Sequence, residues 1–137
     1  MRYLGLDLGT KTLGMATSDR LGMIASPFKV LNYDNYLNSL DELVSIIETE
    51  KIEAIVLGLP LNMNGSEGPR VIETKEFKNI LEKEISVPIY FQDERLTTTE
   101  AEKVLIAADV SRKKRKKIID KMAAVIILQS YLNKEKR

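Results

Sequence analysis

The sequence predicts one α/β domain of 137 residues, built on a mixed five-stranded sheet with helices on both faces. Two observations predict this fold. The first part of the chain contains three β-type runs separated by turn residues, which is typical of an antiparallel meander. After them, apolar runs alternate with helical spacing, which is typical of crossover units that add parallel strands. A chain of this length suits a single domain, residues 1–137, and hardly two.

The three opening strands are expected at Tyr3–Gly9, Leu13–Ser18 and Met23–Val30. A helix follows, because its apolar residues recur three or four apart with acids between them: Leu37, Leu40, Leu43, Val44 and Ile47. Ala54–Leu59 is apolar throughout, as expected of a strand buried on both faces.

The second half of the chain begins with a polar, glycine-rich stretch, Asn62–Pro69. A helix is expected from about Arg70 to Glu84, and a strand over Val87–Gln92. Two further helices are expected at Thr97–Ala108 and Arg112–Leu132. The chain contains no repeat and no domain linker, and the predicted order is β-β-β-α-β-α-β-α-α.

The composition excludes several kinds of chemistry. The chain has no cysteine and no histidine. Disulfides, thiol nucleophiles, zinc sites built on Cys or His and imidazole bases are therefore excluded. An enzyme with this composition must use carboxylates, hydroxyls, lysine or a bound metal.

The charge is unevenly distributed. The net charge is only +1, which on average suggests no polyanionic partner. Residues 112–137, however, contain ten Lys or Arg and two Asp or Glu, a net charge of +8. Residues 1–111 contain eleven Lys or Arg and eighteen Asp or Glu, a net charge of −7. Such asymmetry points to nucleic acid or an anionic membrane.

No targeting or membrane segment is expected. The apolar start is broken by Asp7 and Lys11, unlike a signal peptide. The longest uncharged apolar run near the end, Met122–Leu128, is far shorter than the roughly 20 residues that span a bilayer. We therefore expect a cytoplasmic protein without a membrane partner.

Three acids are candidates for a functional site. Asp7 lies inside an apolar strand, where it either caps the following turn or binds a metal, because a buried charge needs a partner. Glu94 follows a strand at its carboxyl end, where ligands gather in α/β sheets, but it could also be a solvated acid or pair with Arg95. Asp120 lies in the last helix. Its structural alternatives to a site role are a favourable interaction with the helix N-terminus or an ion pair with a neighbouring lysine.

Together the three acids suggest one site. A strand aspartate, a strand-end glutamate and a helix aspartate can converge at one edge of a sheet. Such carboxylates suit Mg²⁺ or Mn²⁺, with Asp7, Glu94 and Asp120 as ligands. Two such ions can activate a water and stabilise both oxygens of a phosphodiester displacement, which needs no histidine or cysteine.

Several other residues could contact phosphate. Thr10 and Lys11 lie in a glycine-bearing turn that is not a P-loop, so this signal is weak alone. Arg70 offers a guanidinium fork that could bind phosphate. The polar stretch before it could equally be a mobile surface loop without a functional role.

Six consecutive cations begin the last helix: Arg112, Lys113, Lys114, Arg115, Lys116 and Lys117. Such a run is usually a solvated face. Its most specific role is binding the phosphate backbone of a nucleic acid without sequence preference. The apolar helix that follows favours burial over a membrane interface.

Taken together, the motifs of this chain resemble those of the YqgF (RuvX) family. The matching blocks occur in order over about the whole chain: Gly5–Lys11, Leu13–Asp19, Val56–Pro60, Gly65–Arg70, Asp93–Thr98 and Asp120–Gln129. The resemblance implies a ribonuclease H-like, or resolvase-like, fold. It also implies a cytoplasmic bacterial nuclease that matures the 5′ end of pre-16S rRNA, in a family earlier proposed to resolve Holliday junctions.

The resemblance also implies roles for individual residues. The family's acids correspond to Asp7, Glu94 and Asp120, and its phosphate-contacting positions to Thr10, Lys11 and Arg70. In resolvases proper, the second acid lies on the strand beside the first. Here that strand ends in Gly58–Pro60 without an acid, so Glu94 must substitute, and the site could bind one ion or assemble fully with substrate.

Three alternatives remain open from the sequence. The same chemistry could act on branched DNA, or the chain could be a nucleic-acid-binding module whose acids are structural. A sugar kinase or actin-like ATPase shares the Gly-x-Asp-x-Gly-Thr start but needs two such domains. The oligomeric state, monomer or homodimer, is also open.

Overall fold

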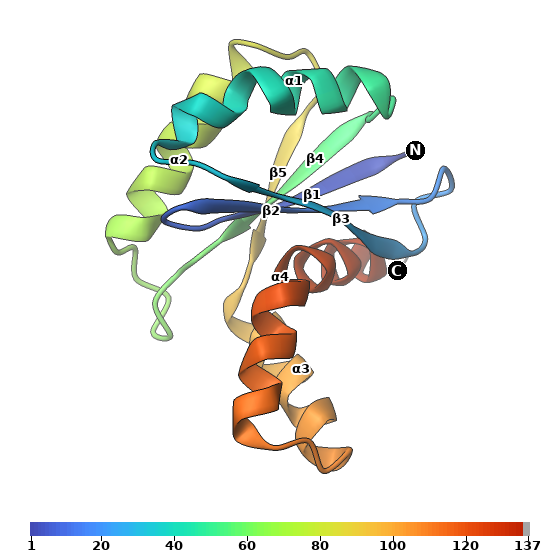
Figure 1. Ribbon diagram of the computed structural model, residues 1–137, viewed down its shortest axis with the longest axis vertical. Helices are drawn as coiled ribbons and strands as arrows, with labels where there is room; N and C mark the ends of the chain where they lie inside the picture. The colour runs from blue at the N-terminus through green and yellow to red at the C-terminus, as the bar shows by residue number, and fades with distance from the viewer. Residues whose placement is uncertain (136–137) are drawn as a thin grey trace.

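The computed structural model describes residues 1–135. Six side chains within that range are outside the description: Tyr36, Leu96, Thr97, Thr98, Glu100 and Asp120. The chain forms a five-stranded sheet of order β3-β2-β1-β4-β5, with helices on both faces (Figure 1). The predicted mixed α/β architecture is therefore confirmed.

The five strands divide into an antiparallel and a parallel part. β1 (Tyr3–Leu8) pairs antiparallel with β2 (Thr12–Ser18), which in turn pairs antiparallel with β3 (Ala25–Asn32). On its other side, β1 pairs parallel with β4 (Ala54–Leu59), and β4 pairs parallel with β5 (Ile89–Asp93). The first three strands are thus the expected meander, and β4 has the bounds that its apolar run predicts.

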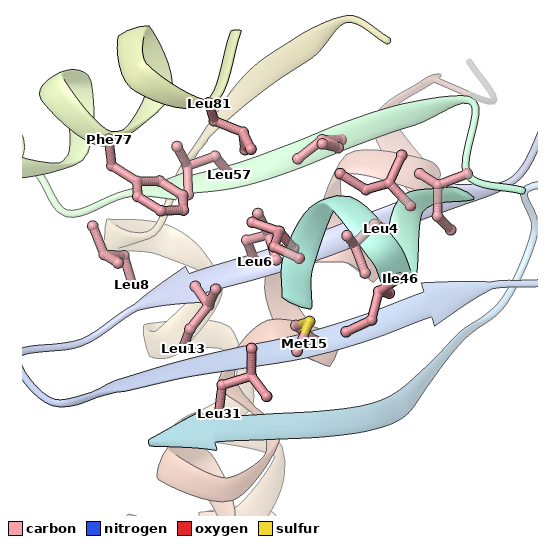
Figure 2. Packing of buried hydrophobic residues seen from close by; sticks show 14 of the residues in the cluster. Leu4, Leu6, Leu8, Leu13, Met15, Leu31, Ile46, Leu57, Phe77 and Leu81 are labelled. Atoms are coloured by element: carbon pink, nitrogen blue, oxygen red, sulfur yellow. The ribbon is translucent and has the colours of Figure 1, made fainter. Parts of the chain in front are cut away.

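Helices α1 (Leu40–Thr49) and α2 (Pro69–Glu82) cover one face of the sheet, and a 3-10 turn, η1 (Tyr36–Ser39), precedes α1. Alternate residues of the central strands point toward these two helices and form the larger core (Figure 2). Its fully buried members include Leu4, Leu6, Leu13, Leu43, Leu57 and Phe77. This core fixes the sheet on which the polar residues of the other face are arranged.

Helix α4 (Arg112–Glu135) covers the opposite face through its later turns. The helix lies very close to β1, because a β-carbon placed on Gly5 would be 2.7 Å from the Cβ of Leu128 and 3.0 Å from the backbone oxygen of Ala124. Real side chains essentially never approach so closely, so only glycine fits at position 5. This close packing fixes α4 over the centre of the sheet.

Helix α3 (Arg95–Ala107) and the first turns of α4 run side by side and extend away from the sheet (Figure 1). They form a helical hairpin whose far end carries the start of α4. None of the helices in the described part of the chain has the length and apolar character needed to cross a membrane.

Several element bounds differ from the sequence-based expectation by one to three residues, and two of the shifted starts have a visible cause. β3 begins at Ala25 rather than Met23, because the Asp19 carboxylate accepts hydrogen bonds from the backbone N–H groups of Met23 and Ile24 (2.8 and 2.9 Å) and holds both in the turn. α3 begins at Arg95, two residues earlier than expected, because the Asp93 carboxylate accepts the Arg95 backbone N–H at 2.9 Å.

Candidate active site

Asp7 lies on the central strand and faces α4. Its neighbours Leu6 and Leu8 belong to the core under α1 and α2, so the alternation of the strand directs Asp7 to the other face. Its partner across β2 is Gly14, and a β-carbon there would be 3.7 Å from the Cβ of Asp7. The half-buried carboxylate thus has little side-chain bulk beside it on β2.

Glu94 reaches the same face from the end of β5. Its backbone N–H donates to the carbonyl of Leu59 at 3.2 Å, which fixes it at the carboxyl end of β4. Its side chain lies over Gly58, where an added β-carbon would be 2.8 Å from Oε1 of Glu94 and 2.6 Å from Cδ1 of Ile127. The missing side chain at position 58 therefore leaves the space that the Glu94 carboxyl fills.

The two acids interact directly. Burial, the charge of Asp7 and a hydrogen bond with Asp7 raise the pKa of Glu94 to about 8, and the nearby Arg70 opposes part of this rise. Two carboxylates that share a site cannot both ionise freely, so the pair retains a proton near neutral pH in the absence of a cation. Such a pair favours any divalent cation that can displace this proton.

Arg70 is also brought to the site. It lies in the first turn of α2, where Nη2 donates to the carbonyl of Leu8 at 2.6 Å and Nη1 donates to Glu73 at 2.6 Å. Because Leu8 follows Asp7, the guanidinium is anchored next to the acid pair. Its charge is available to an anion there, although part of its hydrogen-bonding capacity is used within the fold.

Thr10 and Lys11 occupy the exposed turn between β1 and β2. The turn is closed by the Gly9 N–H donating to the Thr12 carbonyl at 2.8 Å. Lys11 lines a hollow of about 320 Å³ with Asn32, Tyr33 and Asp34, and Asp7 is not among its lining residues. The turn therefore lies just beyond the strand end that carries Asp7.

Asp120 is on α4, but its side chain is outside the described residues. The next residue, Lys121, lines a hollow of about 220 Å³ together with Asp7 and Ala124. Among the side chains that the structure describes, no group of three or more acids, histidines or cysteines forms a metal cluster. Asp7 and Glu94 form the described pair, and α4 brings position 120 to the same region.

The six cations form the first two turns of α4, at the far end of the helical hairpin (Figure 1). Five of them are exposed, whereas Arg115 is half-buried and donates from Nη1 to the Val110 carbonyl at 2.8 Å. Arg115 thus holds the connection between α3 and α4. The run leads along the helix toward position 120 and is not packed around the acid pair.

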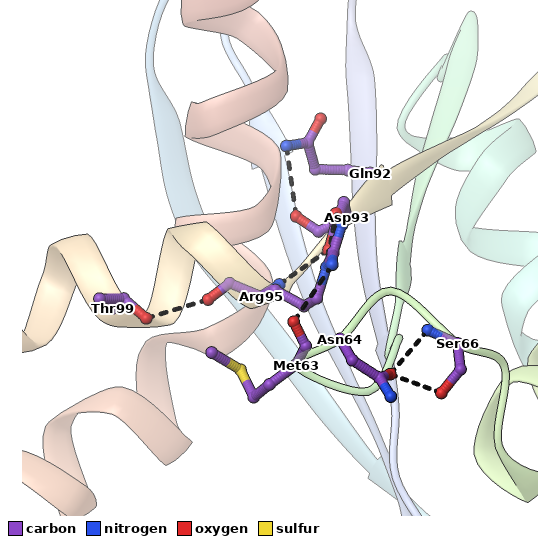
Figure 3. Close-up of polar contacts among 7 residues, drawn as sticks. All are labelled: Met63, Asn64, Ser66, Gln92, Asp93, Arg95 and Thr99. Carbon is purple, nitrogen blue, oxygen red and sulfur yellow. Dashed lines mark hydrogen bonds and ion pairs between the residues drawn. The ribbon is translucent and has the colours of Figure 1, made fainter.

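Sequence reasoning missed the role of Arg95. Its guanidinium binds Asp93, with Nε at 3.0 Å and Nη2 at 2.7 Å from Oδ2, and this ion pair holds the pKa of Asp93 below its usual range (Figure 3). Asp93, and not Glu94, is therefore the partner of Arg95. The sequence signal for this pair was the spacing of Asp93 and Arg95, two residues apart where the strand turns into the helix. The adjacent Glu94 was an equally close candidate.

Arg95 also contacts the loop that follows β4. Nη1 donates to the carbonyl of Met63 at 3.4 Å and lies 3.1 Å from the point that a β-carbon of Gly65 would occupy. The loop is itself closed by the Gly65 N–H donating to the Asn62 carbonyl at 2.8 Å. Met63, Arg95 and Glu94 line a third hollow, of about 400 Å³.

The strand order and the helices on both faces define a protein of the ribonuclease H-like fold. In the comparison with solved structures, the chain superimposes on Thermus thermophilus RuvC in complex with a Holliday junction substrate. The TM-score is 0.63 over 99% of this chain and 96% of that chain, at 13% identity, a likeness that shows the fold.

The chain belongs to the RuvX family. The family model described as "Holliday junction resolvase" matches residues 1–134. A Geobacillus sp. relative and a Bacillus subtilis relative, both named "Putative pre-16S rRNA nuclease", are each 53% identical over 135 residues, covering 97% of this chain and 98% of theirs. The predicted family and fold are confirmed.

Proposed function

We propose that this protein is a divalent-metal-dependent nuclease of the cytoplasm that hydrolyses phosphodiester bonds in structured nucleic acid. The observation that carries the proposal is the contact between the Asp7 and Glu94 carboxyls over Gly58. Once their shared proton is displaced, the paired carboxylate oxygens are a donor set that fits Mg²⁺ or Mn²⁺. A bound ion would supply activation of the attacking water and charge stabilisation at the phosphate.

The chain's own residues divide the remaining work. Asp7 and Glu94 would hold the ion, with Asp120 as the third ligand expected from the family. Arg70, anchored to the Leu8 carbonyl, would orient a phosphate beside the pair. Thr10, Lys11 and the cations from Arg112 to Lys117 would hold the neighbouring backbone, and this binding would weaken with salt.

We propose precursor 16S rRNA as the substrate, because the relatives at 53% identity carry that activity in their names. Branched DNA is the second candidate, because the family model is described as a Holliday junction resolvase. The two substrates need different experiments, since the fold and the acid pair serve the same hydrolysis on both.

The test is a cleavage assay on a precursor 16S rRNA fragment and a four-way DNA junction, each with and without Mg²⁺ or Mn²⁺. Wild-type protein should cleave with the metal, and Asp7→Asn should lose cleavage while keeping its circular dichroism spectrum. Asp41→Asn, an exposed acid at the start of α1 on the other face, is the matched control. Undiminished cleavage by a clean Asp7→Asn preparation would overturn the proposal.

Calorimetry tests the alternative of a binding module without catalysis. Mn²⁺ should bind the wild type and not the Asp7→Asn or Asp120→Asn variants. Equal Mn²⁺ binding by all three proteins would remove the acid pair from any metal site.

A further inference from the structure

The two hollows beside the acids lie on opposite sides of them. The first is bounded by β2, β3 and α4 and includes Asp7. The second is bounded by the loop after β4, the start of α3 and Glu94. Because the sheet order is β3-β2-β1-β4-β5, the acid pair lies between the hollows. A polymer crossing this edge of the sheet would meet one hollow, then the acids, then the other.

The hollow between β3 and α4 has an unusual lining for a surface strand. It combines the apolar side chains of Phe28, Val30 and Val125 with the cation Lys121 and the carboxylate Asp7. Phe28 remains 38% exposed and Val30 54% exposed, although both lie on an edge strand. Edge strands are normally protected by charges, so an exposed aromatic beside an acid needs another explanation.

The size of the hollow limits what it can hold. Its volume of about 220 Å³ is below the roughly 300–1,000 Å³ of sites that enclose a drug-sized ligand. It suits one planar group that belongs to a longer molecule. An exposed aromatic ring provides a stacking surface for a nucleobase, whatever the base.

A second copy of the chain is a less suitable occupant. Pro27, in the middle of β3, has no backbone N–H to donate to an added strand. The pairing of β2 with β3 is also irregular at Met15 and Ala16, which disturbs the regular edge. Lys121 is exposed at the rim and continues the series of cations on α4, which favours a phosphate-bearing partner.

We propose that the hollow between β3 and α4 is a nucleotide subsite, in which Phe28 stacks on the base next to the phosphodiester at the acid pair and Lys121 faces the adjoining phosphate. The inference rests on the proposed nuclease function, because it assigns one nucleotide of that substrate to a place on the protein. Phe28 is thus a substrate-positioning residue and takes no part in the chemistry.

The test compares Phe28→Ala, Phe28→Tyr and the control Ile72→Ala, an exposed apolar residue on α2. Binding is measured by fluorescence anisotropy in EDTA, with a labelled four-way DNA junction and a labelled RNA hairpin with a 5′ extension. We expect Phe28→Ala to bind about 5- to 100-fold more weakly, as for removal of one stacked base. Phe28→Tyr and Ile72→Ala should bind like the wild type.

A second arm uses cleavable substrates in Mg²⁺. After the cleavage position has been mapped, an abasic site is placed on each side of it in turn. Removing the stacked base should slow cleavage by the wild type to the rate of Phe28→Ala, and it should leave Phe28→Ala itself unchanged. Lys121→Ala should lower the slope of log affinity against log salt by about one.

The outcomes separate the inference from the proposed function. Equal binding by Phe28→Ala and the wild type would overturn the subsite and leave the nuclease proposal standing. A wild type that binds both probes but cleaves neither would overturn the nuclease proposal. The subsite would still stand if Phe28→Ala binds the probes more weakly. A dimer that Phe28→Ala abolishes, with nucleic-acid binding unchanged, would assign the hollow to a second copy of the chain.

Discussion

Gly58 and Glu94 form a single structural unit, although they lie at the ends of different strands. The Oε1 atom of Glu94 lies 2.8 Å from the point that a β-carbon of residue 58 would occupy. The strand next to Asp7 therefore offers space instead of a carboxylate, and the following strand delivers the carboxylate into that space. This relationship explains how an acid pair forms without an acid on β4.

Gly58→Ala should damage the site more than the fold. The new β-carbon would also lie 2.6 Å from Cδ1 of Ile127, so both neighbours must move. We expect a decrease of about 1–3 kcal/mol in the free energy of unfolding and a fall in cleavage rate of at least about tenfold from the displaced carboxyl. Chemical denaturation and cleavage assays measure the two effects.

Gly14→Ala is the packing control for this substitution. Its β-carbon would meet Asp7 and Ala124 at 3.7 and 3.8 Å, which is an ordinary van der Waals separation. It should destabilise the protein less than Gly58→Ala does. Full cleavage activity in Gly58→Ala would contradict the assigned role of Glu94.

Stability should depend on pH through Glu94. Its pKa is raised from 4.5 to about 8 in the folded protein, so between these values the folded state holds a proton that the unfolded state has released. The free energy of unfolding should therefore fall as pH rises through this window, by at most about 1.4 kcal/mol per pH unit, and level off above it. Chemical denaturation in EDTA from pH 5 to 9 measures this slope.

Glu94→Gln should flatten that dependence, because the amide does not titrate. Asp19 and Asp93 have lowered pKa values, so their stabilisation is lost only as pH falls into the acidic range. They do not contribute to the slope above pH 5. An unchanged slope in Glu94→Gln would show that another group carries it.

Arg95→Ala should loosen the loop after β4. The substitution removes the ion pair with Asp93 and the hydrogen bond to the Met63 carbonyl. We expect faster amide hydrogen exchange over residues 62–66, with a global destabilisation of about 1 kcal/mol. The control is Arg20→Ala, which removes a cation in the turn between β2 and β3. Equal exchange in both variants would show that the contacts of Arg95 do not hold the loop.

The exposed cations of α4 should set the salt dependence of substrate binding. Replacing Lys113 and Lys117 by Gln should weaken binding to all sequences alike and lower the salt slope by about one for each phosphate that is no longer neutralised. Anisotropy titrations between about 50 and 200 mM salt measure this slope. Mn²⁺ affinity should change much less. The pair Arg20→Gln and Lys83→Gln is charge-matched, and an equal effect from it would assign the slope to net charge alone.

Most of the fold was predictable because its signals are local. The uniformly apolar run Ala54–Leu59 predicted β4 with its bounds unchanged, helical spacing located α1, and α2 lies within two residues of its expected bounds. Other bounds were wrong by up to three residues, and the starts of β3 and α3 were each wrong by two, because Asp19 and Asp93 bind backbone N–H groups that the apolar pattern does not register.

The sequence suggested that Asp7 and Glu94 lie together, but it did not show how the candidate site is built. The sequence singled out Asp7 and Glu94, yet their interaction depends on the space above Gly58 and on the order of three strands. The sequence also did not show that Arg95 pairs with Asp93 rather than Glu94. Adjacent acids at a strand end differ only in the direction in which their side chains point. The role of Asp120 remains a prediction.

Because α4 is one continuous helix, it fixes the distance between its first cations and its later turns. The first cation, Arg112, and position 120 are eight residues apart on one helix, which corresponds to about 12 Å at 1.5 Å per residue. That length equals about three to four nucleotide steps along one strand, at 3.4 Å each. Under the proposed function, the number of residues between the phosphate-binding cations and position 120 would set the distance from those phosphates to the cut bond.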